Sequence, residues 1–430
     1  MIAALQVLNL RVREARVSRT GLAYAARNVA YFAVALVAAV WAYFWIRFAV
    51  GDGSVGFDFE GTLWDAAIAI RDGRSPYPAP ILSKVDIGNP ALYPPLLMFL
   101  IAPLTVLPWT VGVIIWTVLL AAAISGSLYA LDVRDPRCHL LALISAPVVG
   151  ALIWGNVTPL LVLLVALSWR WREHWVRTGI LVGLAIASKL FLWPLLIWLL
   201  GTRRYRAFGA AVLAIVAGVL IPWAAIGFTG LASYPDLLRA ATQLYAVHSY
   251  SVSTILGAFG IETELATRSA VALGFAIAVL AFLAGRRRED ELSISIAVVA
   301  AILGSPVVWN HYYALLLVPL AIVRPRFSSV WVILALFQFA QMLPRPGLRS
   351  TELEPGGIAC CKPDDVAMTT WVFTHAPPSL WLALGHVGLA ILVAVAVWAI
   401  LASRWTGTAL RGTECVGRPG GARRADAGRT

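Results

Sequence analysis

The sequence predicts an all-α, polytopic membrane protein. Of its 430 residues, 60% are hydrophobic and 13% are charged, and the mean hydropathy is +0.80. Soluble domains carry about a quarter charged residues, so this composition excludes a water-soluble fold. Apolar runs such as 29–50 and 379–402 are long enough for the ~20 residues that a membrane-spanning helix needs. Helices are expected because they pair all their backbone polar groups internally in lipid.

Apolar stretches recur along the chain and predict about twelve membrane segments. They begin near Val29, Trp109, His139, Val157, Thr178, Leu190, Ala207, Ala266, Leu292, His311, Ser328 and Ser379. The first run follows five arginines, is too long for a signal peptide and has no small-residue cleavage site after it. We therefore interpret it as a permanent anchor.

The basic residues are distributed asymmetrically between the predicted loops. Alternate loops and both ends hold 24 of the 34 Lys and Arg residues, in the ranges 1–28, 132–138, 170–177, 201–206, 284–291, 324–327 and 403–430. The intervening loops, 51–94, 228–253 and 344–379, hold 7. The positive-inside rule then predicts that both termini are cytoplasmic. The net charge of +12 is a topology signal in a cell-membrane protein, and we expect no nucleic-acid partner.

Three regions follow from this pattern. They are a basic cytoplasmic arm over 1–28, a transmembrane domain over 29–403 and a disordered cytoplasmic tail over 404–430. The four cysteines are Cys138, Cys360, Cys361 and Cys415. The predicted topology puts the first and last on the opposite side from the middle pair, so no disulfide framework is expected.

Three apolar stretches resemble broken hairpins, because their halves are short and a polar break falls between them. The breaks are Trp154-Gly155-Asn156, Ser188-Lys189, and Ser305-Pro306 through Asn310-His311. The halves around Lys189 reach only about 16 Å, roughly half of the hydrocarbon thickness. Irregular backbone at that depth is tolerated only inside protein or against a wet cavity. All three breaks are expected to point toward the outer half of the membrane.

The first outer loop is acidic and contains the best candidate for a catalytic carboxylate. Six acidic residues lie from Asp52 to Asp86, against three basic ones. Asp58 lies between two phenylalanines directly after the first span, where an unpaired carboxylate is costly without a role. The apolar residues over 64–70 share one predicted helix with Asp65 and Arg71, which suggests an outer-face amphipathic helix lying on the membrane.

The order of these motifs resembles glycosyltransferase family 87. The motifs are Asp58-Phe59, Asp72-Gly73 with Tyr77, Tyr93-Pro94-Pro95, Gly155-Asn156-Val157-Thr158-Pro159, Ser188-Lys189 with Pro194, and Ser305-Pro306 with Trp309-Asn310-His311-Tyr312. The resemblance spans about residues 30 to 325. It implies the GT-C membrane fold and transfer of mannose from a polyprenol-phosphate donor. It also implies an outward-facing cavity that the donor enters from the bilayer.

In that family an aspartate of the first outer loop is taken as the general base, and Asp58 is the matching position. One departure is that Glu60 follows Asp58-Phe59, so two carboxylates could share or exchange the role. A sugar on a polyprenyl phosphate is already activated, so we expect no nucleotide and no other cofactor. One carboxylate is needed to accept the proton of the attacking hydroxyl, and a single displacement inverts the anomeric centre.

The departing lipid phosphate gains negative charge and calls for preorganised donors or cations. Lys189 is the lysine in the middle of an apolar run, and its alternative role is snorkelling or pairing with a backbone carbonyl. His311 and its neighbour Asn310 are a second donor pair, unless the histidine is a satisfied structural group.

Further candidates for sugar binding are Asn156, Tyr93 and Trp309. Asn156 and Tyr93 equally fit a role in bracing helix breaks, and most tryptophans fit interfacial belts. No cluster has metal-ligand spacing, so we expect no bound metal. A magnesium ion bridging Asp58, Glu60 and the donor phosphate is left open.

These residues favour a membrane glycosyltransferase that moves a mannosyl or related residue from a polyprenyl-phosphate sugar donor to an outer-face glycolipid or glycan acceptor. The alternative is a transporter or flippase of a lipid-linked sugar. A carrier would place its charges near the midplane and commonly show repeats. This chain concentrates acids in an outer loop and shows no internal repeat, which favours the enzyme.

Overall fold

The computed structural model describes residues 26–334, apart from 27, 52, 79, 81–88, 247, 248 and 333. Within this part of the chain every regular element is a helix. The predicted arm, the tail, Cys360 with Cys361 and the segment from Ser379 lie outside the described residues. They stay predictions.

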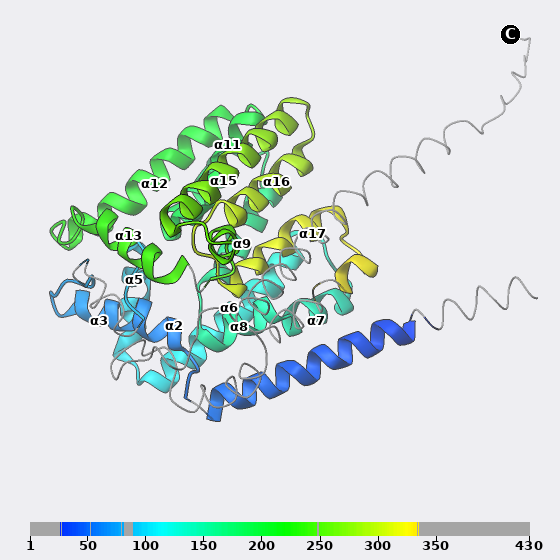
Figure 1. The fold of residues 1–430 in the computed structure, drawn as a ribbon, viewed down its shortest axis with the longest axis horizontal. Helices are drawn as coiled ribbons and strands as arrows, with labels where there is room; N and C mark the ends of the chain where they lie inside the picture. The colour runs from blue at the N-terminus through cyan, green and yellow to red at the C-terminus, as the bar shows by residue number, and fades with distance from the viewer. Residues whose placement is uncertain are drawn as a thin grey trace, which may run out of the picture.

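The chain folds as a succession of long and short helices (Figure 1). The helix Asn28–Gly51 comes first. It is followed by α2 (Phe57–Phe59), η1 (Glu60–Trp64), α3 (Asp65–Arg71), α5 (Leu96–Ile101), η2 (Ala102–Val106), α6 (Trp109–Ala130), α7 (Pro136–Ile144), α8 (Ala146–Trp154), α9 (Thr158–Arg170), α10 (Trp175–Ser188), η3 (Leu190–Leu192), α11 (Pro194–Gly201), α12 (Tyr205–Ala225), α13 (Tyr234–Tyr245), α14 (Val252–Ala258), α15 (Thr263–Arg286), α16 (Asp290–Leu303), η5 (Asn310–Leu316), α17 (Leu317–Val323) and η6 (Ser329–Val332).

Four described helices are long and apolar enough to cross a membrane, namely Asn28–Gly51, α6, α12 and α15. The pair α7 and α8 makes a fifth if it is one span bent by 60° at Ser145. The predicted number of about twelve segments is not confirmed. The reason is that the other described apolar stretches, such as α9, α10 and η5 with α17, form helices of 10–17 residues, short of the ~20 that a full span needs.

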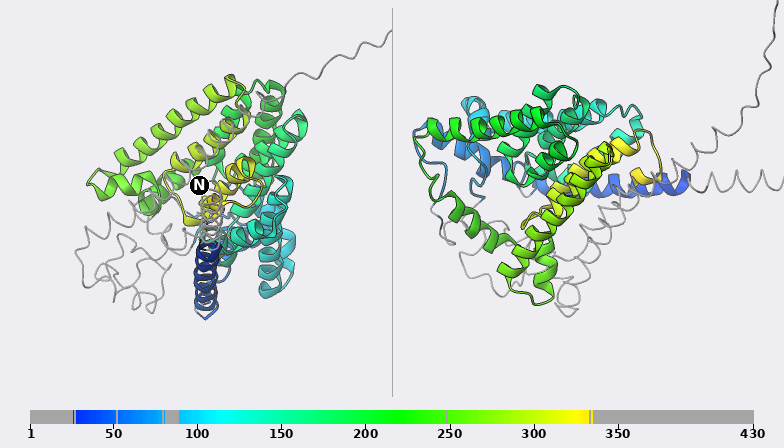
Figure 2. Two further views of the ribbon diagram at one scale, coloured as in Figure 1. Left: turned by 90° about the vertical axis from the view of Figure 1, so that its right-hand side faces the viewer. Right: turned by 90° about the horizontal axis from the view of Figure 1, so that it is seen from above.

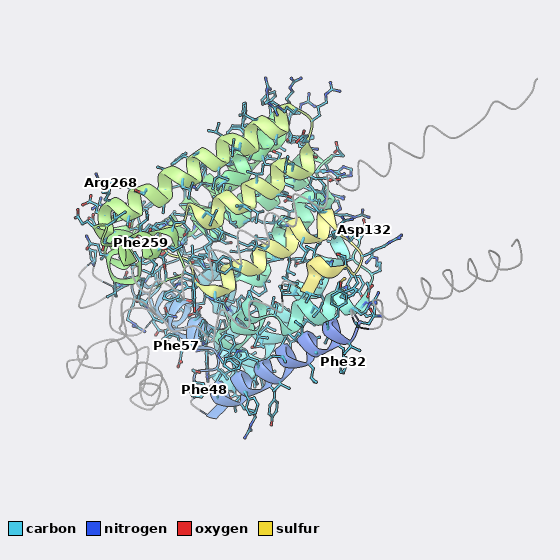
Figure 3. The ribbon with its side chains drawn as sticks, turned by 45° about the vertical axis from the view of Figure 1, so that its right-hand side comes forward. Phe32, Phe48, Phe57, Asp132, Phe259 and Arg268 are labelled. Carbon is cyan, nitrogen blue, oxygen red and sulfur yellow. The ribbon has the colours of Figure 1, made fainter. Side chains whose placement is uncertain are left out.

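The long helices expose apolar side chains where a soluble protein would carry charge. The helix Asn28–Gly51, dark blue, lies along the outside of the bundle (Figures 1 and 2). Phe32 and Phe48 of this helix are 70% and 45% exposed and point away from the bundle (Figure 3). Leu213 of α12 and Val279 of α15 are similarly exposed, at 69% and 56%. Such surfaces are stable in lipid and indicate a membrane protein.

Small residues let helices α10 and α12 pack closely against each other. On α10, Gly179 and Gly183 face α12, and a Cβ added at Gly179 would lie 2.5 Å from the carbonyl oxygen of Ala207. This is the small-residue packing that brings membrane helices together. The contact fixes α10, and with it the break at Lys189.

The helices end at the three breaks that the sequence predicts. Helix α8 ends at Trp154 and α9 begins at Thr158, while α10 ends at Ser188 and η3 begins at Leu190. Helix α16 ends at Leu303 and η5 begins at Asn310. At these three points inside the bundle, backbone N–H and C=O groups therefore lack partners within a helix and can bond other groups.

The predicted amphipathic segment forms a helix, as part of the succession α2, η1 and α3. Its apolar side packs against other parts of the protein. Trp64 and Ala66 are 6% and 3% exposed, and Ala67 is fully buried. Asp65 is exposed on the opposite side. A position on the membrane surface is not confirmed and stays a prediction.

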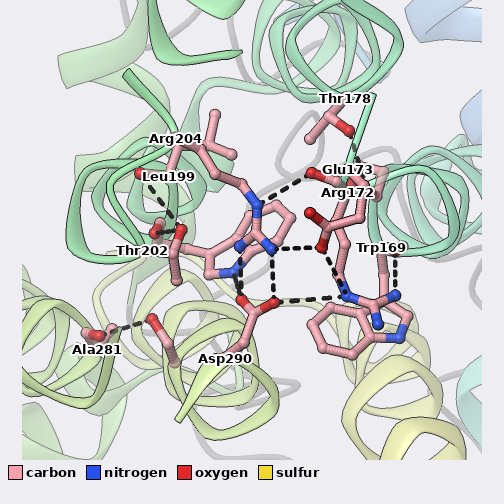
Figure 4. A network of polar contacts seen from close by, with 12 residues as sticks. Trp169, Arg172, Glu173, Thr178, Leu199, Thr202, Arg204, Ala281 and Asp290 are labelled. Carbon is pink, nitrogen blue, oxygen red and sulfur yellow. Dashed lines mark hydrogen bonds and ion pairs between the residues drawn. The ribbon is translucent and has the colours of Figure 1, made fainter. Parts of the chain in front are cut away.

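A network of charges joins three loops at one end of the bundle (Figure 4). Asp290 accepts hydrogen bonds at 2.9 Å from both terminal nitrogens of Arg204 and one at 2.7 Å from Trp198. Arg172 lies 3.5 Å from the same carboxylate, and Glu173 contacts Arg204 at 3.0 Å. The loops before α10, α12 and α16 are thereby held together, at the end predicted to be cytoplasmic.

Candidate active site

Asp58 lies on a short helical turn that is attached to the end of α8. Gly56, just before this turn, has a φ of +82°, a conformation that glycine adopts without strain. Its N–H donates to the carbonyl of Ile153 at 2.7 Å. A Cβ at Gly56 would also lie 2.8 Å from Val113. The entry to the turn therefore depends on glycine and on the break after α8.

Phe59 anchors the turn in the core. It is fully buried, and its ring stacks on Trp116 at 5.0 Å and on Trp109 at 5.7 Å between centroids. Gly155 makes room for this ring, because a Cβ there would lie 2.7 Å from the Cβ of Phe59. Trp116 in turn donates from Nε1 to the carbonyl of Gly155 at 2.7 Å. Phe59, the residue after Asp58, thus fixes the backbone that carries Asp58.

The helix after Asp58 widens into a π-helical turn over Glu60–Trp64. Such turns are rare and frequently lie at functional sites. The hydroxyl of Thr62 donates to the carbonyl of Asp58. The backbone around the candidate base is therefore held from its own helix as well as from α8.

The Asp58 carboxylate accepts one amide hydrogen bond on each oxygen. Asn89 donates to Oδ1 at 2.8 Å and Asn156 donates to Oδ2 at 2.7 Å. Asn156 is 1% exposed, and its own oxygen accepts from the N–H and the hydroxyl of Thr158 at 3.0 and 2.7 Å. Burial raises the pKa of Asp58 above its ordinary value, and the hydrogen bond from Asn156, the charge of Lys189 and the bond from Asn89 oppose that rise.

Lys189 lies at the second break, close enough for its charge to act on Asp58. The residue is 7% exposed, and within the described part of the chain its ammonium has no hydrogen-bond partner. Aromatic rings surround it instead: Nζ lies 3.9 Å from the ring centroid of Tyr312, 5.0 Å from Tyr93 and 5.9 Å from Phe191. Such cation–π contacts stabilise a cation but leave its three hydrogen-bond donors available.

Asp58 with its two amide donors and Lys189 with its aromatic rings form one cluster, and Tyr93 contacts both parts of it. Its hydroxyl lies 3.3 Å from the amide nitrogen of Asn156, and its ring faces Lys189. Burial raises the pKa of Tyr93, and the charge of Asp58 raises it further. The phenol therefore stays protonated and acts as a hydrogen-bonding group.

The third break reaches the same region from another side. The ring of His311 lies edge-on to Trp154, with 6.2 Å between centroids. A Cβ at Gly150 would lie 3.7 Å from the amide nitrogen of Asn310. Both side chains are buried, at 1% and 2% exposure, and among the described residues the amide nitrogen and both imidazole nitrogens have no hydrogen-bond partner. Buried polar atoms of this kind call for a ligand or water.

The described side-chain contacts of two predicted residues, Glu60 and Trp309, do not include Asp58 or Lys189. Glu60 is exposed at the start of η1, so the described structure gives no support for shared or exchanged roles with Asp58. The ring of the half-buried Trp309 makes an edge-to-face contact with the ring of Tyr245, with 5.9 Å between centroids. No group of three or more metal-ligating side chains occurs among the residues that the structure describes.

The sequence did not identify Asn89 as a site residue or Tyr312 as the aromatic face nearest to Lys189. A signal for Asn89 exists, because the chain has five asparagines, at 9, 28, 89, 156 and 310. Three of them lie in or beside this cluster. The scarcity of asparagine in this apolar chain is therefore a signal that Asn89 belongs to the site.

The fold and the cluster define a polytopic α-helical membrane protein with a carboxylate and a lysine among the ends of broken helices. The chain belongs to glycosyltransferase family 87, whose model matches residues 91–308, and it is accordingly a glycosyltransferase. The matched range includes Tyr93, Asn156 and Lys189, while Asp58 and Asn89 precede it. The resemblance predicted from the motifs is confirmed.

Two curated relatives extend the similarity over most of the chain. One is a polyprenol-phosphate-mannose-dependent alpha-(1-2)-phosphatidylinositol pentamannoside mannosyltransferase of Mycolicibacterium smegmatis, 25% identical over 69% of this chain and 71% of the relative. A protein of the same description from Mycobacterium tuberculosis is 26% identical over 76% of this chain and 73% of its own length. No solved structure matches the chain, so the GT-C architecture stays a prediction.

Proposed function

We propose that this glycosyltransferase moves a mannosyl residue from a polyprenyl phosphate to an outer-face glycolipid, with inversion and with Asp58 as the general base. The family and the relatives' dependence on polyprenol-phosphate-mannose support the donor. The relatives' acceptor, a phosphatidylinositol mannoside, supports a glycolipid of that class. The observation that carries the mechanism is the Asp58 carboxylate, held by Asn156, whose amide also reaches the hydroxyl of Tyr93, while the ring of Tyr93 faces the buried ammonium of Lys189.

The proposed step is a single displacement at the anomeric carbon. An acceptor hydroxyl attacks, its oxygen bonds to the anomeric carbon and its proton passes to Asp58. The bond from that carbon to the phosphate oxygen breaks, and the lipid phosphate leaves with the bonding electrons. A β-linked donor gives an α-linked product. A carboxylate whose pKa is raised by burial is a stronger base than one in water, provided that it is ionised.

Lys189 is proposed to receive the leaving phosphate. Its ammonium has three donors that no described side chain occupies, and cations in poorly hydrated sites stabilise developing phosphate charge strongly. His311 and Asn310 offer further donors from the third break, and Asn156 and Tyr93 face the reacting carboxylate. The transporter alternative has no support of its own beyond broken helices, which the enzyme also needs.

The test is transfer of label from polyprenyl-phosphate mannose in membranes that contain the protein, with and without added phosphatidylinositol mannoside. Asp58→Asn keeps the shape and removes the base, so we expect transfer to fall by about 10²–10⁴-fold. The matched control Glu60→Gln, on an exposed carboxylate two residues away, is expected to retain activity. Equal transfer by Asp58→Asn and the parent would remove Asp58 as the base. Transfer of label that never enters the added phosphatidylinositol mannoside would exclude that acceptor class.

A further inference from the structure

Asn89 contacts the candidate base from a separate segment of the chain. Its amide donates to Oδ1 of Asp58 at 2.8 Å, opposite the amide of Asn156 on Oδ2 at 2.7 Å. The two asparagines are 31 and 98 residues from Asp58 in the sequence. The two donors fix the rotation of the carboxylate, while each of its oxygens still has a lone pair available for a substrate proton.

Gly61 allows Asn89 to approach this closely. A Cβ at Gly61 would lie 2.2 Å from the carbonyl oxygen of Asn89, a separation that real side chains do not reach. The backbone of Asn89 therefore rests on the π-helical turn that follows Asp58. A larger residue at 61 forces the Asn89 backbone and the turn that carries Asp58 apart, and we expect this to disturb the contact between Asn89 and the carboxylate.

The surroundings of Asp58 make these donors important for its charge. Burial disfavours the ionised form, and the charged or titratable groups that act on the carboxylate are Lys189, Tyr93 and Tyr312. The two tyrosines are neutral donors or aromatic faces, and the proposed mechanism directs Lys189 to the phosphate. Hydrogen bonds from amides to the ionised form favour that form.

We propose that Asn89 is a positioning residue for the Asp58 base, forming with Asn156 an amide clamp that holds the carboxylate in one orientation and keeps it ionised. This inference rests on the proposed role of Asp58. Asparagine suits the position because its amide is neutral, whereas an aspartate at 89 would place a second negative charge against the base.

The experiment is the pH profile of mannosyl transfer in membranes for the parent, Asn89→Leu and Asn89→Asp. Loss of one donor raises the pKa of Asp58, so the acid limb of the Asn89→Leu profile moves up by about one pH unit. Transfer at the acid limb then falls about tenfold and recovers as the pH rises. Asn89→Asp moves the limb further upward, and KM for the donor changes little in either variant.

Gly61→Ala provides a second route that leaves the chemistry of Asn89 intact, and it too is expected to raise the acid limb. It keeps the inference testable if Asn89→Leu does not accumulate in the membrane. The control is Asp72→Asn, which alters an exposed ion pair with Arg74 at 3.1 Å and is expected to leave the profile unchanged. An unshifted acid limb, or a loss of equal size at every pH, would overturn the positioning role.

The variant Asp58→Asn separates the two proposals. If it retains activity, the base assignment itself fails. If it is inactive while Asn89→Leu and Gly61→Ala keep the parental acid limb, Asp58 stands as the base and only the clamp is wrong.

Discussion

At the scale of single residues, the candidate site depends on charges that the fold buries together. Asp58 on α2 and Lys189 at the second break are linked through Asn156 and Tyr93, and each carries a charge that acts on the other. Burying an isolated charge is costly, so a lysine whose three donors face no described acceptor is retained at a cost in stability. Binding of an anionic phosphate would offset that cost.

Replacing Lys189 tests this assignment. Lys189→Met keeps an unbranched apolar side chain only one atom shorter but removes the charge, so we expect transfer to fall by about 10²–10³-fold. Donor affinity should fall with it, since phosphate binding is weakened in the ground state too. Lys189→Arg keeps the positive charge and should retain more activity than the methionine variant. Parental kinetics in Lys189→Met, measured at matched protein levels, would rule out a role for Lys189 at the phosphate.

The sequence identified some of these residues because of where they occur. A lysine inside an apolar run and an aspartate directly after a span are both unusual, and Asn156 lies within a visible helix break. Nothing local in the sequence links a loop asparagine to a carboxylate 31 residues away, so only the scarcity of asparagine in the chain points to Asn89. Its contact depends on Gly61, whose role is a close approach between segments and leaves no pattern in the sequence.

At the scale of elements, break positions were more predictable than spans. A polar residue inside an apolar run costs too much to leave in lipid, and so marks where a helix ends. Whether the halves on either side form full spans depends on tertiary packing. Helices α9 and α10 are short because α9 begins and α10 ends inside the protein, at the Asn156 and Lys189 breaks respectively.

The loops at the other end of these helices are held by Asp290, which gives a prediction about stability. Asp290→Asn removes a charge that binds two nitrogens of Arg204 and leaves the guanidinium, only 18% exposed, without its main partner. We expect a loss of roughly 1–3 kcal/mol of stability, seen as a lower unfolding temperature in detergent. Activity per folded molecule should be unchanged, because the site lies at the opposite ends of the helices.

Asp132→Asn is the matched control for that measurement. Asp132 bonds Arg134 and Arg170 at 3.3 and 3.4 Å, but its side chain is 62% exposed. Solvent-exposed ion pairs contribute only about 0–1 kcal/mol. An equal fall in unfolding temperature for both variants would show that Asp290 has no special role in joining the loops.

At the scale of the whole molecule, the arrangement of charged loops and site residues predicts one orientation in the membrane. The ion-paired loops, with Asp132 among them, lie at the end opposite Phe259 and Arg268 (Figure 3). Helices α3 and α13 lie at the end of the bundle away from the turn between α15 and α16 (Figure 1). The basic loops are predicted to be cytoplasmic, so α13 and the end of the bundle that carries α3 are predicted to face outward.

Cysteine labelling tests this orientation. With the four native cysteines replaced by serine, Asp236→Cys on α13 and Arg287→Cys before α16 place single thiols at exposed positions near opposite ends. A membrane-impermeant maleimide should label Asp236→Cys in intact cells and Arg287→Cys only after permeabilisation. Mannosyl transfer by both variants would show that they are folded. The reverse labelling pattern would put the Asp58 cluster toward the cytoplasm, and an acceptor on the outer face could then not reach the base.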